Sequence, residues 1–89
     1  MTVFVNIKLS AHGRNNLAEF ERAIVGYPEV LECHTMAGSS DYLLKVVARD
    51  IDAYERFLRD QLLRLPHVQE AHSNIAMSEV KRTTELPLD

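Results

Sequence analysis

The chain has 89 residues, of which 46% are hydrophobic and 26% charged, enough for one globular domain but too few for two cores. A net charge of −3 argues against a general nucleic-acid-binding surface, because such a surface is basic. Cys33 is the only cysteine, which excludes an internal disulfide and favours a reducing compartment. No apolar run approaches the roughly 20 residues of a membrane span, and the N-terminus lacks a signal-peptide pattern. These features predict a soluble cytoplasmic protein.

The first part of the chain predicts a strand, a helix and a second strand. The apolar face of the first strand, over residues 2–9, consists of Val3, Val5, Ile7 and Leu9. After a loop, Asn15 or Asn16 can cap a helix. The apolar stripe of this helix consists of Leu17, Phe20 and Ile24. Pro28 ends the helix, and residues 30–37 then form a strand whose mixed polarity is typical of a sheet edge.

A turn near the middle of the chain joins two strands. The segment Ala37–Tyr42 is rich in Gly, Ser and Asp, the residues that tolerate or stabilise turns. It lies between the strand at residues 30–37 and a stronger strand at residues 42–48, an order that predicts a β-hairpin. The second of these strands is apolar on both faces, which is typical of a central strand.

The last part of the chain predicts a helix and a long strand. Asp50 or Asp52 can cap the helix, and Asp52 has a capping-box partner three residues later. The apolar stripe of the helix consists of Ile51, Tyr54, Leu58, Leu62 and Leu65. Pro66 ends the helix, and a last strand follows over residues 68–80.

The two halves of the chain repeat one another. Tyr27–His34 and Leu65–His72 share Pro, Val, Glu and His at matching positions, so each half is one strand–helix–strand unit. Two such units give an α+β, ferredoxin-like βαββαβ fold, with a four-stranded antiparallel sheet and both helices on one face. We expect residues 1–80 to form this domain and residues 81–89 to form a C-terminal tail or a short extra strand.

Two helices cover only one face of such a sheet, yet its central strand is apolar on both. Leu43 and Val47 lie opposite the face that carries Leu44 and Val46, and Phe4 adds an aromatic ring. Exposed apolar surface forgoes about 25 cal/mol per Å². A second copy packed sheet to sheet would bury this surface. We therefore expect a twofold homodimer whose interface holds a cleft for a ligand.

Three segments of the chain resemble one family. They are Met36–Val46, which includes the Gly-x-x-Asp-Tyr turn, then Leu65–Val68, and finally Met77–Leu88. In this order and spacing they are similar to the effector-binding domain of the leucine-responsive/asparagine-regulator (Lrp/AsnC) transcription factors. The resemblance implies a ferredoxin-like fold that dimerises through its sheets and often assembles into rings of dimers, such as an octamer.

The resemblance also implies a ligand site. In that family small molecules, usually amino acids, bind between subunits near the Gly-x-x-Asp-Tyr turn. The residues that this implies here are Gly38, Ser39, Ser40, Asp41 and Tyr42, with Ser78, Thr83 and Thr84 as weaker additions. A Gly-containing turn offers backbone N–H groups to the carboxylate of an amino acid, and Asp41 or a Thr hydroxyl suits its ammonium group. The alternative is that the turn only closes a hairpin, with Asp41 as a local cap.

The sequence differs from the family pattern at its start. Family members usually carry an N-terminal helix-turn-helix, whereas this sequence begins at its first strand. Neither predicted helix has a basic outer face, so we expect no direct DNA binding. The resemblance to stand-alone domains of this type implies regulation without DNA contact. In this mode, the ligand shifts the assembly of dimers with one another or with a full-length Lrp/AsnC regulator as partner.

Two other functions are open. A small dimeric α+β barrel enzyme, of the monooxygenase or isomerase type, would need polar residues in its cleft, for which Asn6, His72 and Asn74 are candidates. A pure assembly module would form oligomers without responding to a ligand. We favour the sensor, and expect no enzymatic activity, cofactor or metal. His34 and His72 fall on opposite sheet edges, and Cys33 has no evident base and is most simply a buried residue.

Overall fold

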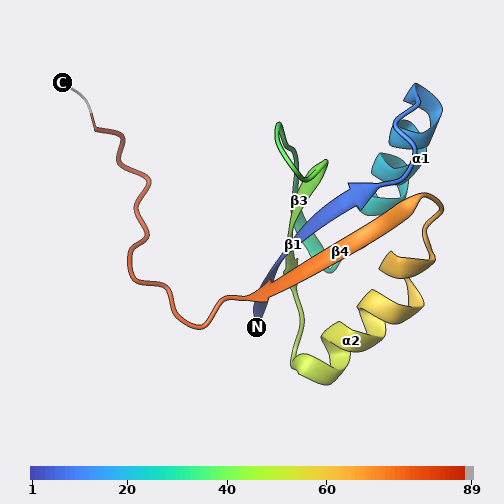
Figure 1. Ribbon diagram of the computed structural model, residues 1–89. Coiled ribbons are helices and arrows are strands. Elements are labelled where there is room, and N and C mark those ends of the chain that lie inside the picture. The colour runs from blue at the N-terminus through green and yellow to red at the C-terminus, as the bar shows by residue number, and fades with distance from the viewer. Residues whose placement is uncertain (88–89) are drawn as a thin grey trace.

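The computed structural model describes residues 1–87, which fold in the order strand, helix, strand, strand, helix, strand (Figure 1). The elements are β1 (Thr2–Leu9), α1 (Arg14–Val25), β2 (Val30–Thr35), β3 (Tyr42–Val47), α2 (Ile51–Asp60), the short 3-10 helix η1 (Leu62–Arg64) and β4 (Val68–Ile75). The predicted βαββαβ arrangement is confirmed, with η1 as an addition.

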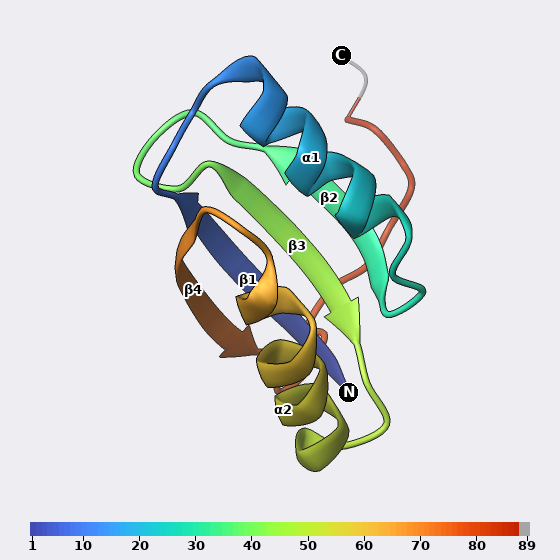
Figure 2. The same cartoon turned by 90° about the vertical axis from the view of Figure 1, so that its right-hand side faces the viewer.

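The four strands form one antiparallel sheet in the order β2-β3-β1-β4. The two strands predicted to be central, β1 and β3, lie side by side, with Val3 opposite Val46 and Ile7 opposite Tyr42. Both helices lie on the same side of the sheet, which Figure 2 shows from the helical side. This arrangement follows from right-handed crossovers in both halves of the chain. The ferredoxin-like α+β fold is therefore confirmed.

The core lies between the helices and the inner face of the sheet. Alternate side chains of β1 and β3 point into it, as the period of two in a strand requires. Its buried residues are Val3, Val5, Ile7, Leu9, Phe20, Ile24, Tyr42, Leu44, Val46, Tyr54, Phe57 and Leu62. The ring centroids of Phe20 and Tyr42 are 4.7 Å apart, which fastens α1 to β3. Burial of this set is the main stabilising contribution to the fold.

The helices differ from the prediction at two points, the N-cap of α1 and the apolar stripe of α2. Gly13, rather than Asn15 or Asn16, is the N-cap of α1, and it makes no side-chain hydrogen bond. In α2, Ile51 was predicted to be buried but is 48% exposed, whereas Phe57, which was not in the predicted stripe, is buried. The prediction started the apolar stripe of α2 too early, because Ile51 is the first helical residue and lies beyond the edge of the core.

Within residues 1–87, no helix has both the length and the apolar character that crossing a membrane requires.

The strands are shorter than predicted. Residues 36–41 form the hairpin connection, so β2 ends at Thr35. The last strand ends at Ile75 rather than near Val80, because Ile75 lies opposite Val3 and β1 begins one residue earlier. The N–H of Ala76 still donates to the carbonyl oxygen of Thr2, at 2.9 Å. Beyond that bond β4 has no neighbouring strand left to pair with.

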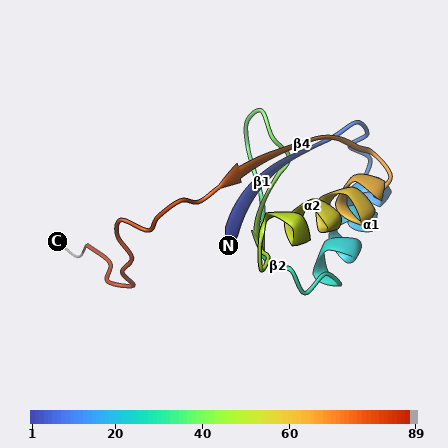
Figure 3. The same cartoon turned by 90° about the horizontal axis from the view of Figure 1, so that it is seen from below.

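The segment after β4, residues 76–87, contains neither helix nor strand. The predicted boundary at residue 80 and the choice between a tail and an extra strand stay predictions, and residues 88 and 89 lie outside the described residues. Figure 3 shows the segment leaving the sheet on the side away from the helices. Its apolar side chains are almost fully exposed, at 97% for Met77 and 94% for Val80.

The outer face of the sheet carries the apolar residues predicted for it together with charged groups. Phe4 is 37% exposed there, and Leu43 and Val47 are half-buried by their neighbours within the sheet. Lys45 lies opposite Phe4, and its Nζ is 3.7 Å from a carboxylate oxygen of Glu32. The face therefore mixes a hydrophobic centre with charged groups, as many non-obligate protein interfaces do.

The N-terminus of α2 provides a test of the fold. Asp50, not Asp52, caps this helix, and its carboxylate accepts a hydrogen bond from the N–H of Ala53 at 2.8 Å. This bond, followed by the charge of nearby Arg49, lowers the pKa of Asp50 in the folded state. The stabilisation is therefore present above the unfolded-state pKa and is lost as the pH falls through the folded-state pKa.

We expect Asp50→Ala to lower the melting temperature at neutral pH, because a bare N-terminus leaves backbone N–H groups unpaired. The difference from the wild type should shrink as the pH is lowered to about 3, where the wild-type cap is itself being protonated. Asp52→Ala is the matched control in the same turn and should show little effect. If Asp52→Ala lowered the melting temperature as much as Asp50→Ala, the assignment of Asp50 as the cap would be contradicted.

Candidate functional site

The hairpin connection is built around a glycine with an unusual backbone. Gly38 has φ +135°, in a region that residues with a side chain rarely adopt. A Cβ atom at this position would meet nothing within 4 Å, so the backbone conformation alone requires glycine here. Gly38 and Ser39 are exposed, and Ser40 is half-buried. The turn therefore projects its main chain into solvent at one end of the sheet.

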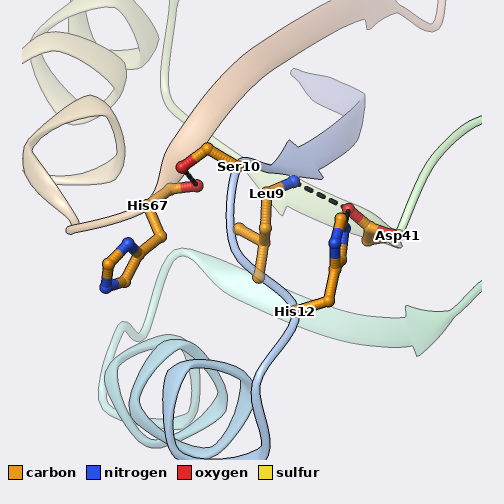
Figure 4. A network of polar contacts seen from close by, with 5 residues as sticks. All are labelled: Leu9, Ser10, His12, Asp41 and His67. Carbon is orange, nitrogen blue, oxygen red and sulfur yellow. Dashed lines mark hydrogen bonds and ion pairs between the residues drawn. The ribbon is translucent and has the colours of Figure 1, made fainter.

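Asp41 ties this turn to the end of β1, as Figure 4 shows. Its N–H donates to the carbonyl oxygen of Ile7 at 2.8 Å, and its own carbonyl oxygen accepts from Met36 N–H at 3.0 Å. The carboxylate atom Oδ2 accepts a hydrogen bond from Leu9 N–H at 2.7 Å and lies 3.0 Å from Nε2 of His12. The bond from Leu9 is the main reason why the pKa of Asp41 lies below its usual value, and His12 adds to it. Asp41 is therefore ionised at neutral pH.

These contacts show that Asp41 is more than a local turn cap. Leu9 and His12, which the sequence analysis did not select, hold the carboxylate from the end of β1 and the loop that follows it. The register explains the contact with Leu9: β1 and β3 pair only as far as Ile7 and Tyr42, so the N–H of Leu9 lies beyond the ladder and takes a side-chain acceptor instead.

Several groups of the turn are free to bind a ligand. Within residues 1–87, the N–H groups of Gly38, Ser39 and Ser40 have no hydrogen-bond acceptor. The second oxygen of Asp41, Oδ1, likewise receives no hydrogen bond from that part of the chain. The turn thus presents backbone donors, which suit an anion, beside a carboxylate oxygen, which suits a cation. A zwitterion matches both features.

Tyr42 points the other way. Its side chain is 2% exposed and packs in the core on the helical side of the sheet, where its hydroxyl donates to Glu21 at 2.6 Å. Burial, together with this hydrogen bond, raises the pKa of Tyr42. The side chain anchors the start of β3 against α1, so only the main chain of Tyr42 lies near the turn.

The three predicted residues of the C-terminus lie apart from the turn. Ser78 lines a groove of about 740 Å³ on the outer face, together with Phe4, Leu31 and Val47. Thr83 and Thr84 lie farther along the C-terminal segment, which leaves the sheet beside the N-terminus, at the end opposite the hairpin (Figure 1). A single chain therefore brings Gly38, Ser39, Ser40 and Asp41 together, and leaves the C-terminal residues elsewhere.

The remaining candidate groups have ordinary partners or none. His34 and His72 each face a carboxylate two residues earlier on their own edge strand, at 3.0 Å and 3.3 Å. Cys33 is exposed rather than buried, because it lies on the sheet edge. Asn6, His72 and Asn74 lie on the open outer face, not in an enclosed cavity. Residues 1–87 contain no group of three or more His, Cys, Asp or Glu side chains that could hold a metal ion.

The chain is thus a ferredoxin-like α+β domain with an exposed turn that carries unpaired backbone N–H groups next to an ionised carboxylate. A family model of the Lrp/AsnC ligand-binding domain matches residues 2–86. The chain belongs to the Lrp/AsnC family, as its ligand-binding domain.

The relatives of known function are regulators. The chain is 38% identical over 89 residues to the transcriptional regulator AzlB of Bacillus subtilis, and it covers 57% of that protein. It is 37% identical over 86 residues to the leucine-responsive regulatory protein of Escherichia coli, of which it covers 52%. The chain thus spans little more than half the length of these relatives.

Solved structures show the same fold. A transcriptional regulator of Neisseria meningitidis, determined as its complex with L-methionine, superposes with a TM-score of 0.88 at 32% identity, over 97% of this chain and 55% of that one. A protein of Thermus thermophilus superposes with a TM-score of 0.78 at 25% identity. This second match covers 91% of this chain and 98% of the Thermus chain, so the domain also occurs as nearly the whole of a solved chain.

Proposed function

We propose that this domain senses an amino acid, which binds at the hairpin turn between two subunits and changes how the subunits assemble. The observation that carries the proposal is the turn itself, which places unpaired N–H groups beside an ionised carboxylate. The Neisseria regulator that was solved with L-methionine has the same fold, which makes L-methionine the first effector to test.

The residues divide into three roles. The N–H groups of Gly38, Ser39 and Ser40 bind the effector carboxylate, and Oδ1 of Asp41 accepts from its ammonium group. Tyr42 contributes its main chain only, because its side chain is buried. Ser78, Thr83 and Thr84 belong to the C-terminal segment and would complete the site from a second subunit.

The proposed assembly is a homodimer formed by the outer faces of two sheets, and four such dimers form an octamer. The mixed outer face and the exposed C-terminal segment support it, since both leave apolar side chains in solvent. The effector acts by binding one assembly more tightly than another, which shifts the population. A full-length Lrp/AsnC regulator is the proposed partner in the cytoplasm, with no direct contact between this domain and DNA.

An enzyme is not the function that we propose. The relatives that match most of this chain are transcriptional regulators. The polar residues that a barrel enzyme would use are spread over an open face, which does not exclude water from a reaction.

A thermal-shift screen with the twenty amino acids tests the proposed function. A ligand that binds only the folded protein stabilises it by about 2.7 kcal/mol at about 100 times its Kd, so a true effector raises the melting temperature clearly. We expect L-methionine or a related apolar amino acid to do so at millimolar concentration. If none of the twenty changes the melting temperature, the sensor proposal fails.

The proposed dimer predicts that Phe4→Asp weakens self-association. A charge in the centre of a buried interface costs several kcal/mol, so we expect the dimer dissociation constant to rise by at least about tenfold. Leu63→Asp is the matched control, because Leu63 is likewise an exposed hydrophobic residue, at 50% against 37% for Phe4, but lies in η1, outside the sheet face. Sedimentation velocity over a dilution series measures both variants. A wild-type protein that is monomeric at micromolar concentration would refute the dimer.

A further inference from the structure

The loop between β1 and α1, residues 10–13, lies directly beside the proposed effector turn (Figure 4). Both its ends are anchored. The N–H of Ser10 donates to the main-chain oxygen of His67 at 2.7 Å, and the Ser10 hydroxyl lies 3.3 Å from the same oxygen. At the other end, the carbonyl oxygen of Gly13 accepts hydrogen bonds from the first turn of α1. The imidazole of His12 therefore extends from a short, doubly fixed loop.

His12 and Leu9 share one acceptor. Nε2 of His12 is 3.0 Å from Oδ2 of Asp41, the atom that also accepts from Leu9 N–H. Oδ1 of Asp41 receives no hydrogen bond from residues 1–87 and is the oxygen proposed to contact the effector. Any rotation of the carboxylate away from Leu9 would also move Oδ1. His12 thus restrains the orientation of the one side chain that is proposed to contact the ammonium group.

The protonation state of His12 decides how strongly the imidazole restrains the Asp41 carboxylate. A protonated imidazole must donate from Nε2, and its bond to a carboxylate is charge-assisted. A neutral imidazole can place its only proton on Nδ1, and then a nitrogen lone pair faces the carboxylate. The side chain of His12 is 57% exposed, so it exchanges protons freely with solvent.

Other charged groups also act on the Asp41 carboxylate. Lys8, on β1, adds a positive charge that favours the ionised carboxylate. Asp41 itself stays ionised because its pKa is lowered. His67 lies near the same loop, but Ser10 contacts its main-chain oxygen and not its ring. His12 is the histidine whose ring contacts the Asp41 carboxylate, and histidine is the side-chain type that can switch charge near neutral pH.

We propose that His12 is a positioning residue of the effector site, which orients the Asp41 carboxylate and makes effector affinity depend on pH. The inference rests on the proposed function, since it assumes an effector at the turn. Affinity is highest where the imidazole is charged and donates to Asp41, and it falls as rising pH makes the imidazole neutral. Because an exposed ion pair contributes at most about 1 kcal/mol, the expected change is about two- to fivefold.

Calorimetric titration with L-methionine at about pH 6 and about pH 8 tests this with the wild type and two variants. In the wild type we expect affinity to fall by about two- to fivefold between these conditions. His12→Ala should bind more weakly at the lower pH and show no pH dependence. His12→Gln, whose amide donates but does not titrate, should restore the affinity without the pH dependence.

The matched control is His67→Asn. Asparagine tolerates the left-handed backbone of this residue, φ 70°, and the substitution leaves the main-chain oxygen in place. This variant should keep the wild-type pH profile. The proposal would be overturned if His12→Ala kept the wild-type pH dependence of affinity. It would also be overturned if His67→Asn lost that pH dependence.

A second measurement separates this inference from the proposed function. In the ligand-free protein, the backbone amide resonance of Leu9 should shift with pH at the same midpoint as the ring of His12. The shift should vanish in His12→Ala and His12→Gln. If L-methionine does not bind, the proposed function loses its first candidate effector, yet this titration still tests the contact. A Leu9 amide that ignores the protonation of His12 refutes the positioning role whether or not an effector binds.

Discussion

Leu44→Ala is expected to lower the free energy of unfolding by about 2–5 kcal/mol, as removal of a fully buried leucine side chain does when the cavity cannot collapse. Leu44 is 0% exposed and lies in β3, between the neighbouring strands β1 and β2. Its side chain points toward the helices, at the centre of the core. Urea denaturation followed by circular dichroism measures the effect as a shift of the midpoint at nearly constant slope.

The control for this substitution is Leu63→Ala. Leu63 is the same residue type but is 50% exposed in η1, so its truncation removes little buried area. We expect a change within about 0.5 kcal/mol. Equal effects of the two substitutions would mean that the core does not lie between the helices and the sheet.

Gly38→Val is expected to reduce affinity for the effector by at least about tenfold while leaving the protein folded. A β-branched residue cannot adopt φ +135° without strain of about 1–3 kcal/mol, so the turn must change its conformation. The N–H groups that we propose to bind the effector carboxylate would then point elsewhere. The new side chain would not clash with the rest of the domain, because a Cβ there meets nothing within 4 Å.

Gly13→Ala is the matched glycine control. Gly13 has φ −61°, and a Cβ there would lie 3.4 Å from the side-chain nitrogen of half-buried Asn16, a contact that a small shift of this side chain relieves. We expect its affinity for L-methionine to match the wild type, with both variants compared by calorimetric titration and their folding checked by melting temperature. Unchanged affinity in Gly38→Val would show that the effector does not use the backbone of the turn.

The fold was predictable because its signals are local and repeated. Strict alternation in β1 predicted which four side chains enter the core, and all four are fully buried. The Pro66 segment repeats the Pro28 segment, which revealed two equivalent units before any contact was known. The end of β4 was not predictable in this way. Its pattern continues past Ile75, and the strand stops only because β1 has no residue left to pair with it.

The site was predictable only in part. The turn could be selected because Gly38 and Asp41 are recognisable turn residues and belong to a family motif. Tyr42 in the same motif is a core residue, because it is the first residue of β3 and the alternation of that strand points its side chain toward the helices. Leu9 and His12 carry no periodic signal. Their contact with Asp41 spans 32 and 29 residues of chain and exists only because the sheet register brings the end of β1 to the start of β3.

The unpaired segment beyond β4 makes susceptibility to proteases a measure of assembly. Lys81 and Arg82 lie in this extended, exposed stretch, and trypsin requires such a backbone around a basic residue in order to cut. An isolated subunit would lose its last residues rapidly, whereas a neighbour that packs over the stretch would shield it. The rate of clipping, followed by mass spectrometry with and without a candidate metabolite, would therefore report subunit association without a label or an added tag.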